Sequence, residues 1–128
     1  GKLPPADPRL IGLLQIARVC LLQSISETFG LVVLEAWAAG CPAISSRTSG
    51  PSALIEHGRN GWLFDLDRPA TFHEVADVAL TDEAARARVV EAGRTEVRRD
   101  YDTLVLAGRI QRLYAELQEK KYALHHTA

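Results

Sequence analysis

The sequence contains no methionine in its 128 residues. Because a translated protein needs an initiator, we expect the chain to be a fragment or processed part of something longer. Its net charge is −1, from 15 basic and 16 acidic residues, so it lacks the basic excess typical of nucleic-acid-binding proteins. No apolar run approaches the roughly 20 residues that span a bilayer. We therefore expect a cytoplasmic protein without a transmembrane segment.

Cysteine is also scarce. Cys20 and Cys41 lie in apolar contexts without C-x-x-C spacing, so we expect free thiols in the core rather than a disulfide or a metal site. The apolar content of 47% is that of an ordinary globular protein. A chain of this length forms one domain at most, which we take to span residues 1–128.

Helical and strand-like segments alternate over the first half of the chain. The patterns predict helices over residues 8–18, 30–39 and 51–57, and strands over 19–23, 42–46 and 61–64. The first strand is apolar almost throughout, which predicts burial on both faces. Beyond residue 65 we expect helices over 69–80, 82–99 and 103–120. The fold class is therefore α/β, a partial Rossmann-like domain with a short parallel sheet flanked by helices and a helical C-terminal part.

A three-stranded parallel sheet has an open edge. Unpaired N–H and C=O groups along such an edge can pair with another chain. We therefore expect the domain to be marginally stable alone, or to be completed by a dimer partner or by domain swapping.

Two carboxylates, Glu27 and Glu35, stand eight residues apart around the pair Phe29-Gly30. A glycine beside a helix start lets a ligand approach backbone N–H groups, where the helix dipole favours negative charge. If most of the interval is helical, the carboxylates lie roughly 12 Å apart along the axis. That span is similar to the separation of ribose and sugar in a folded nucleotide-sugar, with the diphosphate between them.

The glutamate pair lies inside a longer pattern. It sits in F-G-L-x-x-L-E-A and is followed by G-x-P at residues 40–42, a Ser49-Gly50 pair and an E-x-G-x-N-G-like stretch at 56–61. This pattern resembles the E-x7-E signature of retaining group 1 glycosyltransferases with two Rossmann-like domains, the GT-B architecture. The resemblance is close over residues 1–66 and looser beyond. It implies a donor-binding C-terminal domain whose upstream half-domain and N-terminal acceptor domain are missing partners.

The resemblance also implies roles for the residues of this segment. Glu27 would be the catalytic residue that contacts hydroxyls of the transferred sugar, and Glu35 would accept hydrogen bonds from the ribose. The remaining contacts with the nucleoside-diphosphate sugar would come from Ser24, Thr28, Phe29, Gly30 and Leu31. Structural alternatives stay open: Glu27 as a carboxylate that stabilises a helix end, Glu35 as a solvated side chain, Thr28 as a helix cap and Ser24 as a loop hydroxyl.

No metal or cofactor is implied. Asp65-Leu66-Asp67 matches the D-x-D motif of metal-dependent glycosyltransferases, but a turn before a helix start explains it better. The cationic clamp for the diphosphate would lie upstream, and Arg47 and Arg59 cannot be assumed to replace it.

We therefore expect a chain that supplies part of the donor site for hexosyl transfer with retention of configuration. The alternatives are a nucleotide-sugar 2-epimerase and a non-catalytic nucleotide-sugar-binding or assembly module. The helical arginines between Arg86 and Arg112 leave open a peripheral place at the inner membrane face.

Overall fold

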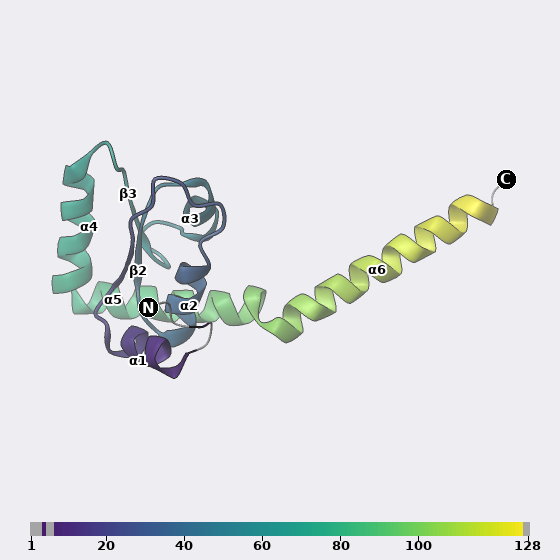
Figure 1. Cartoon of the computed structure of the whole chain (residues 1–128), viewed down its shortest axis with the longest axis horizontal. Coiled ribbons are helices and arrows are strands. Elements are labelled where there is room, and N and C mark those ends of the chain that lie inside the picture. The colour runs from purple at the N-terminus through teal and green to yellow at the C-terminus, as the bar shows by residue number, and fades with distance from the viewer. Residues whose placement is uncertain (1–3, 5–6, 127–128) are drawn as a thin grey trace.

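A computed structural model describes residue 4 and residues 7–126. Three short strands, β1 (Cys20–Leu22), β2 (Ala43–Ser46) and β3 (Trp62–Phe64), form a parallel sheet in the order β1-β2-β3 (Figure 1). Cys20 pairs with Ala43 and Ile44 with Trp62, so the carboxyl ends of the three strands lie at the same edge. The predicted α/β class with a short parallel sheet is confirmed.

Helices connect and follow the strands. They are α1 (Pro8–Ile16), α2 (Leu31–Ala39), α3 (Ser49–Leu54), α4 (Pro69–Thr81), α5 (Glu83–Glu96) and α6 (Thr103–His126), with a π-helical turn η1 (Val97–Tyr101) between the last two. The carboxylate of Asp7 caps α1 by accepting a 2.8 Å hydrogen bond from the Arg9 N–H. Glycines in the left-handed conformation bound α2, Gly30 at φ 91° and Gly40 at φ 81°.

The sheet has a separate apolar cluster on each face, because side chains alternate along a strand. Phe64 and Ile44 pack against Val75 of α4 and Val89 of α5. On the opposite face, residues of the sheet, α2 and the end of α3 form the second cluster, with Val97 and Tyr101 of η1 packed against it. Its buried members are Val33, Trp37, Ala43, Leu54, Ile55 and Leu63. The loop that leads into α2 therefore starts at the carboxyl edge of the sheet and ends on this second face.

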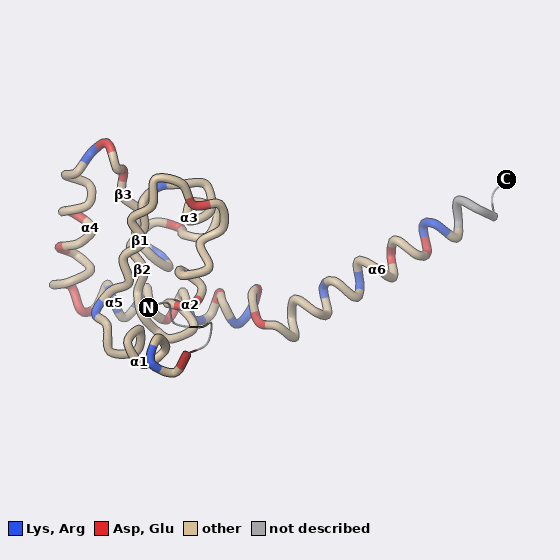
Figure 2. The backbone as a smooth tube through the Cα atoms, viewed as in Figure 1, with Lys and Arg blue, Asp and Glu red and all other residues tan. Residues whose placement is uncertain are grey.

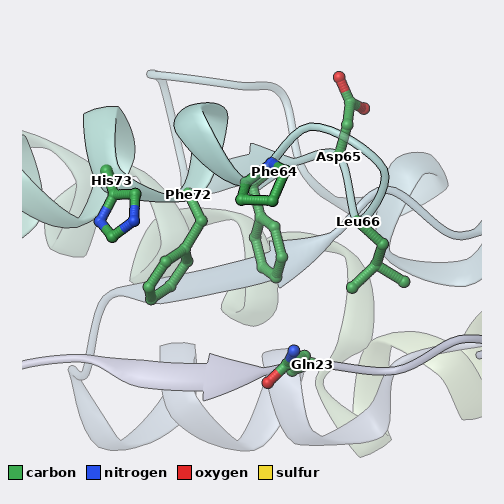
Figure 3. Close-up of a pocket in the computed structure, with 7 residues that line it drawn as sticks. Gln23, Phe64, Asp65, Leu66, Phe72 and His73 are labelled. Atoms are coloured by element: carbon green, nitrogen blue, oxygen red, sulfur yellow. The ribbon is translucent and has the colours of Figure 1, made fainter.

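Strand β1 is not buried on both faces, and that prediction is wrong. Leu22 packs with the α2 cluster, whereas Leu21 is 46% exposed. Strand β1 is an edge strand, so the face that carries Leu21 is only partly covered. Close to it, Gln23 faces the rings of Phe64 and Phe72 across a hollow of about 160 Å³ (Figure 3). None of the predicted site residues lines this hollow.

Helix α6 extends away from the α/β body (Figure 1). Its apolar stripe forms as the 3.6-residue period predicts, but its members are 39–65% exposed: Leu106, Ile110, Leu113, Tyr114 and Leu117. Basic and acidic residues are mixed along this helix (Figure 2). None of the helices in the described part of the chain is long and apolar enough to cross a membrane.

Both cysteines are free thiols, as predicted. Cys41 is buried, and burial raises the pKa of its thiol to about 11, with a smaller contribution from Cys20. Cys41 is therefore protonated and unreactive at neutral pH.

Candidate functional site

The loop between β1 and α2 holds most of the predicted site residues. Ser24 in this loop is held by Ser46, the last residue of β2. The Ser46 hydroxyl donates to the Ser24 carbonyl at 2.6 Å and accepts from the Ser24 N–H at 3.0 Å. Ser46 is fully buried. The hydroxyl that satisfies the loop backbone thus belongs to Ser46 and not to Ser24.

The Glu27 carboxylate lies over the start of α2. Its Oε1 accepts hydrogen bonds from the N–H groups of Phe29, at 3.1 Å, and Gly30, at 3.0 Å. Gly30 is the N-cap residue of α2 and Phe29 precedes it, so Glu27 holds the amides just before the helix rather than those of its first turn. The cap considered for Thr28 is not formed, since the N-cap residue is a glycine. Glu27 therefore makes the structural contact considered as its alternative role, that of a carboxylate that stabilises a helix end. Glu27 and the two amides predicted to meet the donor sugar nucleotide form one cluster.

Glu35 lies on the second turn of α2, on the exposed face of the helix. The segment between Glu27 and Glu35 is helical only from Leu31 onward. The separation of roughly 12 Å expected for the two carboxylates assumed that most of this segment is helical, and only about half of it is. Glu35 borders a groove of about 370 Å³ between α1 and α2, with Leu10, Leu14 and Ala38 among its other walls. A carboxylate at the edge of an apolar groove suits a ligand with a flat apolar part and adjacent hydroxyls.

Leu31 and Phe29 are both exposed, by 64% and 47%. Together with Val32 they give the start of α2 an apolar surface around the Glu27 cluster. Gly30 itself is buried, so a ligand would approach this point over the exposed side chains of Phe29 and Leu31.

The loop arginines are engaged elsewhere. Arg47 pairs with Asp65 at 3.0 Å, and Arg59 bonds with Glu56 and, at 2.6 Å, with Glu96. These ion pairs place Arg59 against α5. These two residues were not assumed to replace the diphosphate clamp, and both guanidinium groups are engaged in ion pairs.

The D-x-D segment forms a turn before α4. The Arg68 N–H donates to the Asp65 carbonyl at 3.1 Å, and the Asp65 N–H donates to the Thr71 hydroxyl at 2.9 Å. The Asp65 carboxylate is hydrogen-bonded by Arg68 and Arg47, which lowers its pKa. Within the described residues, no three His, Cys, Asp or Glu side chains are grouped as metal ligands.

The sequence did not reveal the residues that hold the loop. Ser46 was assigned only to a strand, and Ser49 and Gly50 only to the position of a glycine pair. The Ser49 hydroxyl, at 3.1 Å, and the Gly50 N–H, at 2.9 Å, both donate to the Glu27 carbonyl. Spacing in the sequence gives no indication of these contacts, because they join segments about 20 residues apart.

Most of the sequence is similar to known proteins. The profile of the family described as "Glycosyl transferases group 1" matches residues 2–96. A D-inositol 3-phosphate glycosyltransferase of Pseudarthrobacter chlorophenolicus is 39% identical over 94 residues, which are 73% of this chain and 22% of the relative. An N-acetyl-alpha-D-glucosaminyl L-malate synthase of Bacillus anthracis is 30% identical over 82% of the chain and 28% of the relative. The chain thus spans about a quarter of the length of these relatives.

Solved structures agree in fold. Sucrose-phosphate synthase from Thermosynechococcus elongatus superposes with a TM-score of 0.78 at 25% identity, over 92% of this chain and 30% of that one. The C-terminal domain of a group 1 family protein (LpcC) from Francisella tularensis gives 0.68 at 24% identity, over 80% of this chain and 52% of that one. Together with the profile match over most of the sequence, these similarities show that the chain belongs to the group 1 glycosyltransferase family and has the Rossmann-like fold of its GT-B members.

Proposed function

We propose that this chain supplies part of the donor site of a retaining glycosyltransferase, which transfers a hexosyl group from a nucleoside-diphosphate sugar to an acceptor hydroxyl. The proposal rests mainly on one observation. Glu27 and the N–H groups of Phe29 and Gly30 meet at the start of α2, and Glu35 lies farther along the same helix beside an apolar groove. Ligands of open α/β sheets bind at this carboxyl edge.

The names of the relatives support a role in donor binding. They refer to compounds as different as D-inositol 3-phosphate, L-malate and the lipopolysaccharide core, yet each relative matches more than half of this chain. A shared segment suits the part of the reaction that does not depend on the acceptor. A solved relative in this fold was crystallised with UDP-glucose, at 21% identity and a TM-score of 0.73.

The nucleoside would lie in the groove between α1 and α2. The carboxylate of Glu35 would accept hydrogen bonds from both ribose hydroxyls, and Leu10 and Leu14 offer an apolar wall to the base. The ribose does not change during transfer, so Glu35 would contribute equally to binding of the substrate and of the transition state.

The diphosphate and the sugar would meet the start of α2. On donor binding, the Glu27 carboxylate would exchange the amides of Phe29 and Gly30 for sugar hydroxyls, and these amides would stabilise the developing negative charge of the leaving diphosphate. Glu27 would orient the sugar, and the leaving phosphate would take the acceptor proton. We propose that no metal ion is required, because the remaining positive charge would come from parts of the enzyme outside this chain.

Completion of the sheet is a further part of the proposal. Successive residues of a parallel strand direct their N–H and C=O groups to opposite sides. Cys20 and Leu22 face β2, so the N–H and C=O of Leu21 point to the open edge. We propose that an upstream half-domain, or a second copy by dimerisation or domain swapping, adds a strand here. Light scattering on a size-exclusion column tests the second copy: a strictly monomeric chain at high concentration contradicts it.

Ligand titrations followed by NMR test the donor site. UDP, GDP and their sugars are added to the chain, and we expect weak binding with shifts at residues 27–35 and no sugar transfer by the chain alone. Glu35→Ala should weaken nucleoside-diphosphate binding about ten- to a hundredfold, while Glu27→Gln should change it little.

The same titrations separate the alternatives. Glu27→Gln should selectively weaken binding of the nucleotide-sugar, because the bare nucleotide has no sugar for it to contact. Full affinity in both variants would leave the carboxylates with structural roles only. Binding without turnover after addition of the acceptor domain would favour the non-catalytic module, and inversion at the sugar C2 would favour the epimerase.

A further inference from the structure

We propose that the first turn of α3, Ser49 and Gly50, positions Glu27 for its contact with the donor sugar. The Glu27 carbonyl accepts two hydrogen bonds from this turn, one from the Ser49 hydroxyl at 3.1 Å and one from the Gly50 N–H at 2.9 Å. Both donors belong to α3, whereas Glu27 lies in the loop between β1 and α2. The backbone of Glu27 is therefore held independently of its carboxylate.

Gly50 is required by the close approach of two backbones. It is buried, and a Cβ atom built on it would lie 2.4 Å from the Phe29 nitrogen and 2.6 Å from the Phe29 Cα and carbonyl carbon. Contacts this short with backbone atoms force the loop to move. Any residue other than glycine at position 50 thus displaces the segment that contains Glu27 and its two amide partners.

The loop backbone is held at two points, and neither of them involves the Glu27 carboxylate. Ser46 holds both backbone groups of Ser24, and the α3 turn holds the Glu27 carbonyl. Among the described residues, the Glu27 carboxylate bonds to the amides of Phe29 and Gly30 alone. This arrangement lets the carboxylate change partners while its Cα stays in place, which is the pre-organisation that a sugar-orienting group needs.

Ser49 and Gly50 are thus positioning residues, and their effect on the sugar depends on the proposed function. The decisive variant is Gly50→Ala, with Gly108→Ala as its matched control. A Cβ at Gly108, on α6, meets only the Arg112 guanidinium at 3.9 Å. Ser49→Ala removes the side-chain bond with little risk to folding, since Ser49 is exposed, and Ser49→Thr restores a hydroxyl.

The first measurement is amide–water exchange by NMR on the whole chain without ligand. In Gly50→Ala we expect the Phe29 and Gly30 amides to exchange about tenfold faster, since loop displacement breaks their bonds to the carboxylate. The Leu63 amide of β3 serves as an internal reference and should not change. Ser49→Ala should give a smaller acceleration of about two- to threefold, reversed in Ser49→Thr.

The second measurement is the affinity ratio between UDP-glucose and UDP. Gly50→Ala should reduce any preference for the sugar nucleotide to about one, and Gly108→Ala should keep it. Unchanged exchange at Phe29 and Gly30 in both Gly50→Ala and Ser49→Ala overturns the inference. If the unaltered chain binds neither ligand, the proposed function fails, whereas the exchange rates still decide whether the α3 turn positions the loop. If Gly50→Ala does not fold, Ser49→Ala and Ser49→Thr decide it.

Discussion

Replacement of Glu27 tests whether its carboxylate holds the start of α2 in solution. In the structure two amides, those of Phe29 and Gly30, donate to the same carboxylate oxygen. Glu27→Ala removes both acceptor interactions and the negative charge at the helix start. Glu27→Gln removes the charge but keeps an acceptor oxygen of the same reach. The two variants therefore separate the hydrogen bonds from the electrostatic interaction with the helix.

The expected magnitudes follow from these contacts. Loss of one hydrogen bond costs about 0.5–1.5 kcal/mol, and loss of a charge at a helix N-terminus costs about 0.3–1 kcal/mol at an exposed position. We expect Glu27→Ala to lower the free energy of unfolding by about 1–2 kcal/mol and Glu27→Gln by about 0.3–1 kcal/mol. For a domain of this size, 1 kcal/mol corresponds to a fall in Tm of about 3–5 °C.

Thermal unfolding followed by circular dichroism measures this difference, with urea unfolding as a second method. Glu35→Ala is the matched control, since Glu35 is an exposed glutamate of the same helix and its loss should change stability by less than about 0.5 kcal/mol. Equal melting temperatures for Glu27→Ala and Glu35→Ala would refute the argument that the Glu27 carboxylate holds the amides before α2. The carboxylate would then be free in solution and available to a ligand without any exchange of partners.

Three further predictions concern the edge of the sheet, acid stability and metal dependence. The Leu63 N–H donates to Nδ1 of His57 at 3.1 Å, so His57→Phe should lower the free energy of unfolding in urea by about 1–3 kcal/mol. His57→Asn keeps an acceptor and should lower it clearly less, and equal losses in the two variants would contradict this. Hydrogen bonds from Arg99 and Arg109 lower the pKa of Asp100 to about 2, so its contribution to stability is present above about pH 4 and is lost as the pH falls toward 2. Asp100→Asn should therefore make the free energy of unfolding depend less on pH in that window, and an unchanged acid unfolding curve would count against this. Excess EDTA should leave UDP-sugar affinity unchanged within about twofold, and a loss restored by Mn²⁺ would show that a metal takes part.

Local patterns in the sequence were sufficient for most of the secondary structure. Helix α1 begins at Pro8 as predicted, where Asp7 caps it, and α2 ends at Ala39 as predicted, where Gly40 follows it, because capping depends on residues within one turn. The alternation of apolar strands and helices gave the parallel sheet. The glutamate pair within its longer motif identified the segment where the candidate site lies.

Several boundaries depended on contacts that no local pattern contains. Helix α3 was predicted over residues 51–57 but spans Ser49–Leu54. Its start is held by a distant loop, since the Gly50 amide and the Ser49 hydroxyl both bond to the Glu27 carbonyl. The predicted helix over 82–99 ends at Glu96 and continues as η1, whose Val97 and Tyr101 pack against the α2 side of the core. The exposure of Leu21 follows from the edge position of β1, which sequence alone does not give.

The sequence by itself determined the order of the helices and strands, the family and the residue types of the candidate site, because each of these is encoded in neighbouring residues or in a contiguous motif. Only the tertiary structure decided what these residues contact. It placed the Glu27 carboxylate on the amides of Phe29 and Gly30, and it brought Gly50 against the Phe29 backbone. Such contacts arise when the sheet brings distant segments to one edge, and their geometry depends on the packing of the whole domain.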